Sequence, residues 1–202
     1  MKGKIFSALL LLSLMAILPI TVSKCTVKTV SAGKTATSDT VQYSSDSETD
    51  LCALTAALYR DSYCSETIKA IAIIMNTDYI ANPDNFEKDD FLYKKDATGS
   101  AVDVYDQIEN CVKKVKQTTL RKENKVLFVP YSITSNGSTY SDGAYPYICS
   151  VASPWDCWSD SYDNNAQCIG VSLSGIDWLC KNGYSAENAL KWYLPNFDIC
   201  KE

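Results

Sequence analysis

The feature that most constrains the fold is an apolar segment that runs from Ser65 to Ile80. Its apolar side chains recur at helical spacing, and further isoleucines widen the apolar face. These side chains are Ile68, Ile71, Ala72, Met75 and Tyr79, with Ile73 and Ile74 beside them. Because a helix with so much apolar surface must be covered on most sides, we predict a central, mostly buried helix.

Sequence signals mark both ends of this helix. Ser65 is a candidate N-cap, and Glu66 in the first turn complements the positive end of the helix dipole. The run 82–84 (Asn-Pro-Asp) ends the helix, because proline cannot continue it. The preceding segment, 51–58, is short and apolar, and it predicts either a strand or a first helical turn.

Further helices and strands are expected in no regular alternation. The expected elements after residue 100 are a helix from about Asp103, a strand over 125–133, a strand over 169–173, a helix over 175–182 and a last helix from Ser185 through Trp192. Pro130 indicates that the first strand lies at an edge or contains a bulge. Gly183 is a candidate left-handed cap for the helix before it. The pattern predicts an α+β class.

Length and composition are those of one globular domain. The chain has 202 residues, too few for two domains of ordinary size. Hydrophobic residues make up 46% of it and charged residues 21%, which is ordinary for a globular protein. The absence of histidine excludes histidine-based catalytic triads and histidine metal ligands. The net charge of −5 argues against nucleic acid as a partner.

The first 23 residues have the pattern of a secretory signal peptide. Lys2 and Lys4 precede an apolar run over 5–22, which small residues follow. The run is nearly long enough to span a bilayer, so an uncleaved N-terminal anchor is the alternative and the only expected contact with a membrane. Residues 24–47 are rich in Ser, Thr and Lys and predict a linker, which leaves 48–202 as the folded domain.

Export would expose the nine cysteines of the chain to an oxidising compartment. In an oxidising compartment the eight cysteines from Cys52 onward can form four disulfides, with Cys25 left over. Zinc is the weaker interpretation, because the chain has no Cys-x-x-Cys pair and no histidine. We therefore expect a disulfide-braced domain without a metal or another cofactor. The pairing of the cysteines stays open at this point.

Three segments of the chain resemble a known family. They are 65–72 (Ser-Glu-Thr-Ile-Lys-Ala-Ile-Ala), 144–156 (Ala-Tyr-Pro-Tyr-Ile-Cys-Ser-Val-Ala-Ser-Pro-Trp-Asp) and 183–195 (Gly-Tyr-Ser-Ala-Glu-Asn-Ala-Leu-Lys-Trp-Tyr-Leu-Pro). In this order and spacing they resemble the stage II sporulation protein D (SpoIID) family, sporulation and wall-lysis proteins related to the LytB amidase enhancer. The resemblance covers about three quarters of the chain.

The resemblance implies a SpoIID-like fold and the chemistry of a lytic transglycosylase. Such enzymes cleave peptidoglycan strands that have been stripped of stem peptides. A single glutamic acid protonates the glycosidic oxygen, and the 6-hydroxyl of the sugar then attacks to close an anhydro ring. The resemblance therefore implies a bacterial, extracytoplasmic protein associated with the cell wall. Its expected partners are peptidoglycan glycan strands and cell-wall hydrolases.

The position that the resemblance assigns to the catalytic acid is occupied by Leu58, eight residues before Glu66. Leucine cannot transfer a proton. Asp61 is the candidate for a substitute acid, and its other interpretation is a solvated loop carboxylate beside Arg60. Some members of the family hold zinc after the first helix, but residues 84–100 of this chain contain neither cysteine nor histidine.

The resemblance also implies substrate-binding residues. They are Ser135, Gly137, Thr139, Gln167, Gly170 and Ser172. The first three match a Ser-x-Gly-x-Thr loop beside the family's cleft, and they either contact glycan hydroxyls or form a simple turn. The last three match a later glycine-rich segment, in which Gln167 stands where the family has histidine. Trp155, Trp158, Tyr145 and Tyr147 could stack on sugar rings, a role that requires exposure.

Positions that shape the backbone match the family, whereas positions that perform chemistry differ. This pattern predicts a scaffold that has lost catalysis and binds glycan strands or a cell-wall enzyme. Two alternatives stay open. One is an active lytic transglycosylase that uses a substitute acid such as Asp61, and the other is a secreted interaction module that does not bind glycan.

Overall fold

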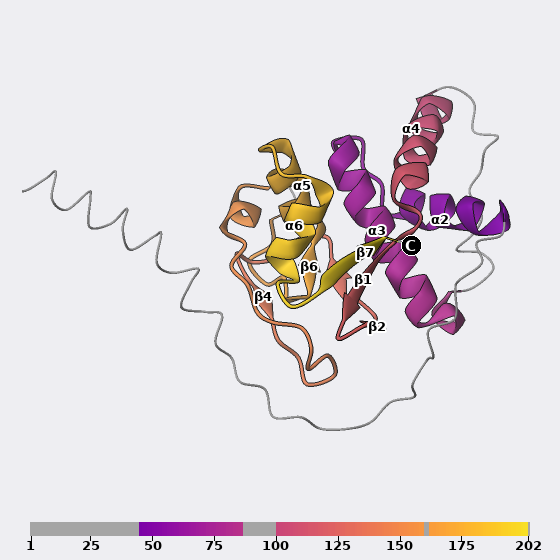
Figure 1. Ribbon diagram of the computed structural model, residues 1–202. Coiled ribbons are helices and arrows are strands. Elements are labelled where there is room, and N and C mark those ends of the chain that lie inside the picture. The colour runs from indigo at the N-terminus through magenta and orange to yellow at the C-terminus, as the bar shows by residue number, and fades with distance from the viewer. Residues whose placement is uncertain (1–44, 87–99, 160–161, 202) are drawn as a thin grey trace, which may run out of the picture. The chain divides into compact units, whose positions relative to one another are not determined.

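The computed structural model describes residues 45–86, 100–159 and 162–201 (Figure 1). The expected signal peptide, Cys25, most of the expected linker and most of segment 84–100 lie outside these residues. Helices and strands do not alternate regularly, so the α+β class is confirmed. Within the described residues, no helix is both long and apolar enough to cross a membrane.

The described residues contain α-helices, 3-10 helices and short strands. The α-helices are α2 (Ser45–Ala57), α3 (Ser65–Ala81), α4 (Ser100–Val115), α5 (Leu173–Lys181) and α6 (Ala186–Tyr193), and the 3-10 helices are η1 (Pro83–Asn85) and η3 (Pro154–Trp158). The strands are β1 (Thr118–Lys122), β2 (Lys125–Val126), β3 (Tyr131–Ser132), β4 (Thr139–Tyr140), β5 (Cys168–Ile169), β6 (Val171–Ser172) and β7 (Asp198–Lys201).

The central buried helix is α3, as predicted. Every residue from Ala70 to Asp78 is buried, and the four isoleucines of the helix before residue 80 are at most 1% exposed. The helix packs against α2 and α4, against α5 and α6, and against β1. Figure 1 shows α3 between the pair α5 and α6 and the pair α2 and α4.

The polar side chains of α3 bind the main chain of the elements that cover it. The Asn76 amide donates hydrogen bonds to the carbonyl oxygens of Lys116 and Thr118, both at 3.0 Å. The Thr77 hydroxyl accepts from the Leu120 N–H at 3.0 Å. These contacts attach the helix to β1 and its approach, and they satisfy polar groups that burial would otherwise leave unpaired.

The start of α3 differs from the prediction. The N-cap is Cys64, not Ser65, and no side chain of the cap residue accepts a hydrogen bond from the helix. Instead, Asp177 of α5 accepts a hydrogen bond from the Cys64 N–H at 3.4 Å. The Ser65 prediction fails because a carboxylate from a distant segment replaces the local serine. Glu66 lies in the first turn, as predicted.

The apolar segment 51–58 is helical and not a strand. Residues 51–57 form the last part of α2, which begins at Ser45, inside the expected linker, and Leu58 lies in the turn that follows. Leu51, Cys52 and Leu54 of this helix are buried in the core. The contacts of α2 with α3 and α4 provide the burial that makes an apolar helix stable here.

A three-stranded antiparallel sheet with the order β2-β1-β7 covers α3 next to α4. Strands β1 and β7 have no counterpart among the strands expected from the sequence. Glu123 and Asn124 join β1 to β2 with φ angles of 53° and 63°. Positive φ at both central residues is the geometry of a type I′ turn, whose twist suits a two-residue hairpin.

The two predicted strands are each divided. Segment 125–133 contains β2 and β3, which belong to different sheets with Pro130 between them, and segment 169–173 contains β6 and the end of β5. Gly170 separates β5 from β6 with a φ of 80°. A Cβ atom at Gly170 would lie 2.1 Å from the Pro130 carbonyl oxygen, so this close backbone approach requires glycine.

The helices after residue 100 follow the sequence signals closely. In α4 the predicted face is buried at Ile108, Cys111, Val112 and Val115. Gly183 has a φ of 94° after α5, as expected for a left-handed cap. The Ser185 hydroxyl accepts a hydrogen bond from the Asn188 N–H at 3.3 Å and caps α6.

Asp78 is a fully buried carboxyl group near the end of α3. Its Oδ1 accepts a hydrogen bond from the Val129 N–H at 2.6 Å. Its Oδ2 is buried and has no hydrogen-bond partner in the described part of the chain. Burial raises the pKa of Asp78 to about 8, against the opposing effect of the Val129 N–H, so the carboxyl group is mostly protonated at neutral pH.

We expect Asp78→Asn to change how stability depends on pH. The unfolded chain releases the Asp78 proton near the ordinary aspartate pKa of 3.8, and the folded chain retains it until about 8. The wild type should therefore lose stability relative to the variant by about 1.4 kcal/mol per pH unit between these values. Urea unfolding from pH 4 to 9 measures this, with the exposed Asp84→Asn as control. Parallel stability profiles for the wild type and Asp78→Asn would contradict the assignment.

Candidate functional site

The position expected to carry the catalytic acid lies in the turn between α2 and α3. Leu58 is partly buried and packs against the hydrophobic core, and its N–H donates to the Thr55 carbonyl oxygen at 3.3 Å. Asp61 is exposed in the same turn. Burial, and after it the Asp61 carboxylate, raises the pKa of Tyr59. The turn therefore presents an apolar side chain to the core and a carboxylate to water.

A buried carboxylate, Asp156 of η3, organises the segment that was expected to contact substrate. Asp156 is 1% exposed. Its Oδ2 accepts hydrogen bonds from the Ser135 hydroxyl at 2.5 Å, the Ser135 N–H at 3.2 Å and the Ser153 hydroxyl at 2.9 Å. Its Oδ1 accepts from the Ser174 hydroxyl at 2.7 Å. These donors offset the cost of burying the charge and tie three separate segments to one side chain.

Tyr193 of α6 extends this network. Its hydroxyl lies 2.5 Å from the Ser153 hydroxyl, and it accepts a hydrogen bond from the Trp155 indole N–H at 3.0 Å. Burial, followed by the Asp156 carboxylate, raises the pKa of Tyr193. A Cβ atom at Gly175 would lie 1.8 Å from the Tyr193 hydroxyl, so glycine is required for this contact.

The Ser-x-Gly-x-Thr loop has its hydroxyl groups directed inward. Ser135 and Thr139 are fully buried. The Thr139 hydroxyl accepts from the Val151 N–H at 3.0 Å, and the Ser135 hydroxyl accepts from the Gly137 N–H at 3.2 Å. Gly137 has a φ of 107°, which favours glycine. The geometry therefore favours the turn over glycan contact for Ser135 and Thr139.

The glycine-rich segment is also mostly structural. Ser172 is fully buried and caps α5 by accepting from the Gly175 N–H at 3.2 Å. Its hydroxyl lies 3.2 Å from that of Ser174, which connects Ser172 to the Asp156 network. Gly170 allows the close approach of the Pro130 main chain. Gln167 alone of the six predicted substrate-binding residues is exposed.

All four tryptophans of the chain meet beside this network. The rings of Trp155 and Trp178 stack with centroids 5.0 Å apart and planes at 5°. Trp192 lies 5.1 Å from Trp155, and Trp158 lies 6.4 Å from Trp178. Trp155 is buried, whereas Trp158 is 74% exposed and Trp192 is 36% exposed. We call these four residues the tryptophan cluster.

The tryptophan cluster joins predicted and unpredicted residues. Trp155 and Trp158 were candidates from sequence, but Trp178 of α5 and Trp192 of α6 were not. The Trp192 indole N–H donates to the Ala152 carbonyl oxygen at 2.9 Å, which fixes its ring against the segment before η3. The two tyrosine candidates are half-buried, and the Tyr147 hydroxyl donates to the Phe128 carbonyl oxygen at 3.0 Å.

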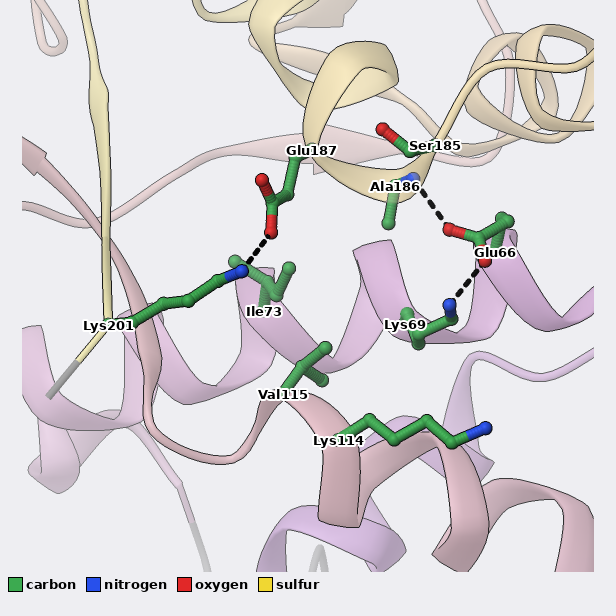
Figure 2. A pocket seen from close by; sticks show the side chains of 9 residues that line it. All are labelled: Glu66, Lys69, Ile73, Lys114, Val115, Ser185, Ala186, Glu187 and Lys201. Carbon is green, nitrogen blue, oxygen red and sulfur yellow. Dashed lines mark hydrogen bonds and ion pairs between the residues drawn. The ribbon is translucent and has the colours of Figure 1, made fainter.

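A separate pocket of about 360 Å³ lies between α3, α4, α6 and β7 (Figure 2). Its charged side chains are largely paired with one another. Glu66 pairs with Lys69 and accepts a hydrogen bond from the Ala186 N–H at 2.9 Å, and Lys201 lies 2.7 Å from Glu187. Burial acts to raise the pKa of Glu66, but the hydrogen bonds from Lys69 and Ala186 lower it. Glu66 therefore holds the N-terminus of α6 and is not poised as a proton donor.

Metal ligands do not gather in the part of the chain that the structure describes. No group of three His, Cys, Asp or Glu side chains there could hold a metal ion. Compared with known protein families and with curated protein sequences, the chain matches none of them.

We expect Asp156→Asn to destabilise the fold by about 2–4 kcal/mol, because an amide nitrogen would face a hydroxyl or N–H donor and leave it unpaired. Chemical denaturation at pH 7 measures the free energy of unfolding. The matched control is Asp163→Asn, which changes an exposed carboxylate and should shift stability by less than about 0.5 kcal/mol. Equal stability of the two variants would show that the Asp156 network contributes nothing.

Proposed function

We propose that the protein is an exported SpoIID-like protein that binds peptidoglycan glycan strands at the bacterial cell wall without cleaving them. The resemblance of segments 65–72, 144–156 and 183–195 supports the family. The observation that carries the binding role is the exposure of Trp158 and Trp192 at the edge of a stacked tryptophan cluster. The loss of cleavage rests on Leu58.

Two features of the α2–α3 turn support a non-catalytic protein. Proton transfer to a glycosidic oxygen requires an ionisable group in a dry cleft. Leu58 has no such group, and it packs against the core. Asp61 has the chemistry but is exposed, and it does not line the pocket of Figure 2.

The tryptophan cluster supports a ligand with alternating apolar faces and hydroxyl groups. Exposed indole rings offer flat apolar surface, and the C–H face of a pyranose ring is its natural complement. A largely exposed tryptophan that is held from behind by other rings loses little conformational freedom when it binds. Because the net charge is −5, stacking on the tryptophan rings explains glycan binding better than charge attraction does.

Export also provides the chemistry for a disulfide-braced domain. All eight cysteines of the described residues are thiols in this structure. An oxidising compartment would allow some of them to pair. A signal peptide at residues 1–23 is the part of the proposal that places them there.

The same surface favours a second candidate, a cell-wall enzyme as the partner. Tryptophan is enriched among the residues that dominate protein–protein binding. In this case the protein is an interaction module, and its tryptophan cluster contacts a protein surface. Binding to purified glycan separates the two candidates.

We expect purified, peptide-free glycan strands to retain the wild-type protein and Trp158→Ala to lose about 5- to 150-fold in retention, because stacking on an aromatic ring contributes about 1–3 kcal/mol per base where proteins bind single-stranded nucleic acid. The matched control is Tyr184→Ala, which removes an aromatic side chain that is 41% exposed and outside the tryptophan cluster. Equal loss in both variants would contradict a specific site. No retention of the wild type would leave the interaction module.

We expect the same strands to remain uncleaved after prolonged incubation with the protein, because Leu58 cannot donate a proton. Mass spectrometry of the soluble products measures anhydro-sugar ends. Anhydro products that disappear with Asp61→Asn would overturn the non-catalytic proposal in favour of an enzyme with a substitute acid. Products that persist in this variant would point to a contaminating hydrolase.

A further inference from the structure

Two cysteines far apart in the chain lie on α3 and α5, two helices that pack together. Cys64 is the N-cap of α3, and its Sγ lies 3.2 Å from the Thr67 Oγ1. Cys180 lies in the last turn of α5, three residues after Asp177, whose Oδ1 accepts hydrogen bonds from the Thr67 hydroxyl at 2.8 Å and from the Cys64 N–H at 3.4 Å. Thr67 is fully buried and Cys180 is 7% exposed, whereas Cys64 is half-buried.

The hydrogen bonds of the Thr67 hydroxyl connect Cys64 to α5. The Thr67 hydroxyl donates its proton to the Asp177 Oδ1 at 2.8 Å. A hydroxyl has one proton, so the Cys64 thiol is the donor in its contact with the Thr67 oxygen at 3.2 Å. Asp177 is itself held by an ion pair with Lys181 at 2.6 Å. Thr67 and Asp177 therefore hold Cys64 against α5, the helix that carries Cys180.

We propose that Cys64 and Cys180 form a disulfide bond once the protein meets an oxidising compartment. The proposal rests on the proposed export only for its oxidant, a small-molecule or protein disulfide. The Cys64 thiolate attacks that disulfide and releases one thiol. The Cys180 thiolate then attacks the Cys64 sulfur of the mixed disulfide and releases the second thiol. Two electrons and the protons of both cysteines pass to the two departing thiols.

The order of attack follows from the surroundings of each sulfur. Cys64 is the more accessible of the two and reacts first. Burial, and after it the neighbouring Cys64, raises the pKa of Cys180 to about 12; Glu66 and Asp177 raise it further, and Thr67 lowers it. The closing step depends on the Cys180 thiolate, so it should accelerate about tenfold per pH unit below that pKa.

Cys111 of α4 is the rival partner at this end of α3. Its sulfur donates to the Ser65 carbonyl oxygen at 3.6 Å and does not share the Thr67 hydroxyl in the described contacts. Asp177 of α5 binds the Cys64 N–H, and Cys180 follows it by three residues on that helix, so Cys180 is better placed than Cys111 to reach Cys64. The proposed bond connects α3 to α5, two helices that already pack together. It would also fix the α2–α3 turn that contains Leu58 and Asp61.

Cleavage before aspartate separates the cysteines completely. The fragments 61–77, 106–141 and 177–197 contain only Cys64, only Cys111 and only Cys180. The full-length protein is treated with oxidised glutathione, its free thiols are alkylated in acid, and it is digested without reduction. We expect one linked species of 61–77 with 177–197. A link from 61–77 to any other fragment, or alkylation of both cysteines, overturns the proposal.

Variants test the bond independently of glycan binding. Cys180→Ser should leave a persistent glutathione adduct on Cys64, whereas the matched control Cys111→Ser should close the bond as the wild type does. Oxidised wild type should unfold about 10 °C above oxidised Cys180→Ser, because the bond closes a long loop. If Cys180→Ser fails to fold, the Cys111→Ser fragment map still decides the pairing. Failure of this map with intact glycan retention would remove the disulfide and leave the proposed function standing.

Discussion

The fold depends on covering one helix on nearly every side. α3 carries isoleucine on adjacent faces, so α2, α4, α5, α6 and β1 all pack against it. The same burial forces its polar side chains to find partners inside the protein. Asn76 and Thr77 bind the main chain around β1, and Glu66 holds the first N–H of α6. One helix thereby determines where the sheet and the last helix lie.

A second buried group, Asp156, connects separate segments in another part of the domain. Its hydrogen bonds hold Ser135, Ser153 and Ser174 from three separate segments. Because these hydroxyl groups are used inside, the surface available to a ligand is carried by neighbouring aromatic rings. This is why the proposed glycan contact lies at Trp158 and Trp192 and not in the serine-rich loop. A protein can keep the frame of a site in this way while its chemistry changes.

Local patterns predicted the helices well and the strands poorly. The helix from Ser65 and the capping by Ser185 and Gly183 depend on residues close in sequence, whose effects are nearly independent of context. β1 was missed because its sequence, Thr118–Lys122, is polar, and it is stabilised by pairing with β7 at the far end of the chain. The Cys64 N-cap was missed because Asp177 provides its hydrogen bond from another helix.

The sequence by itself determined the α+β class and the buried helix at 65–81. These follow from side-chain identity and spacing alone. Only the tertiary structure decided which polar residues form hydrogen bonds in the interior, which tryptophans meet, and which helix packs against Cys64. Those outcomes depend on contacts between residues that are dozens of positions apart, for example Cys64 with Asp177 and Trp155 with Trp192. Burial and pairing at such distances are properties of the packed chain, and no local pattern encodes them.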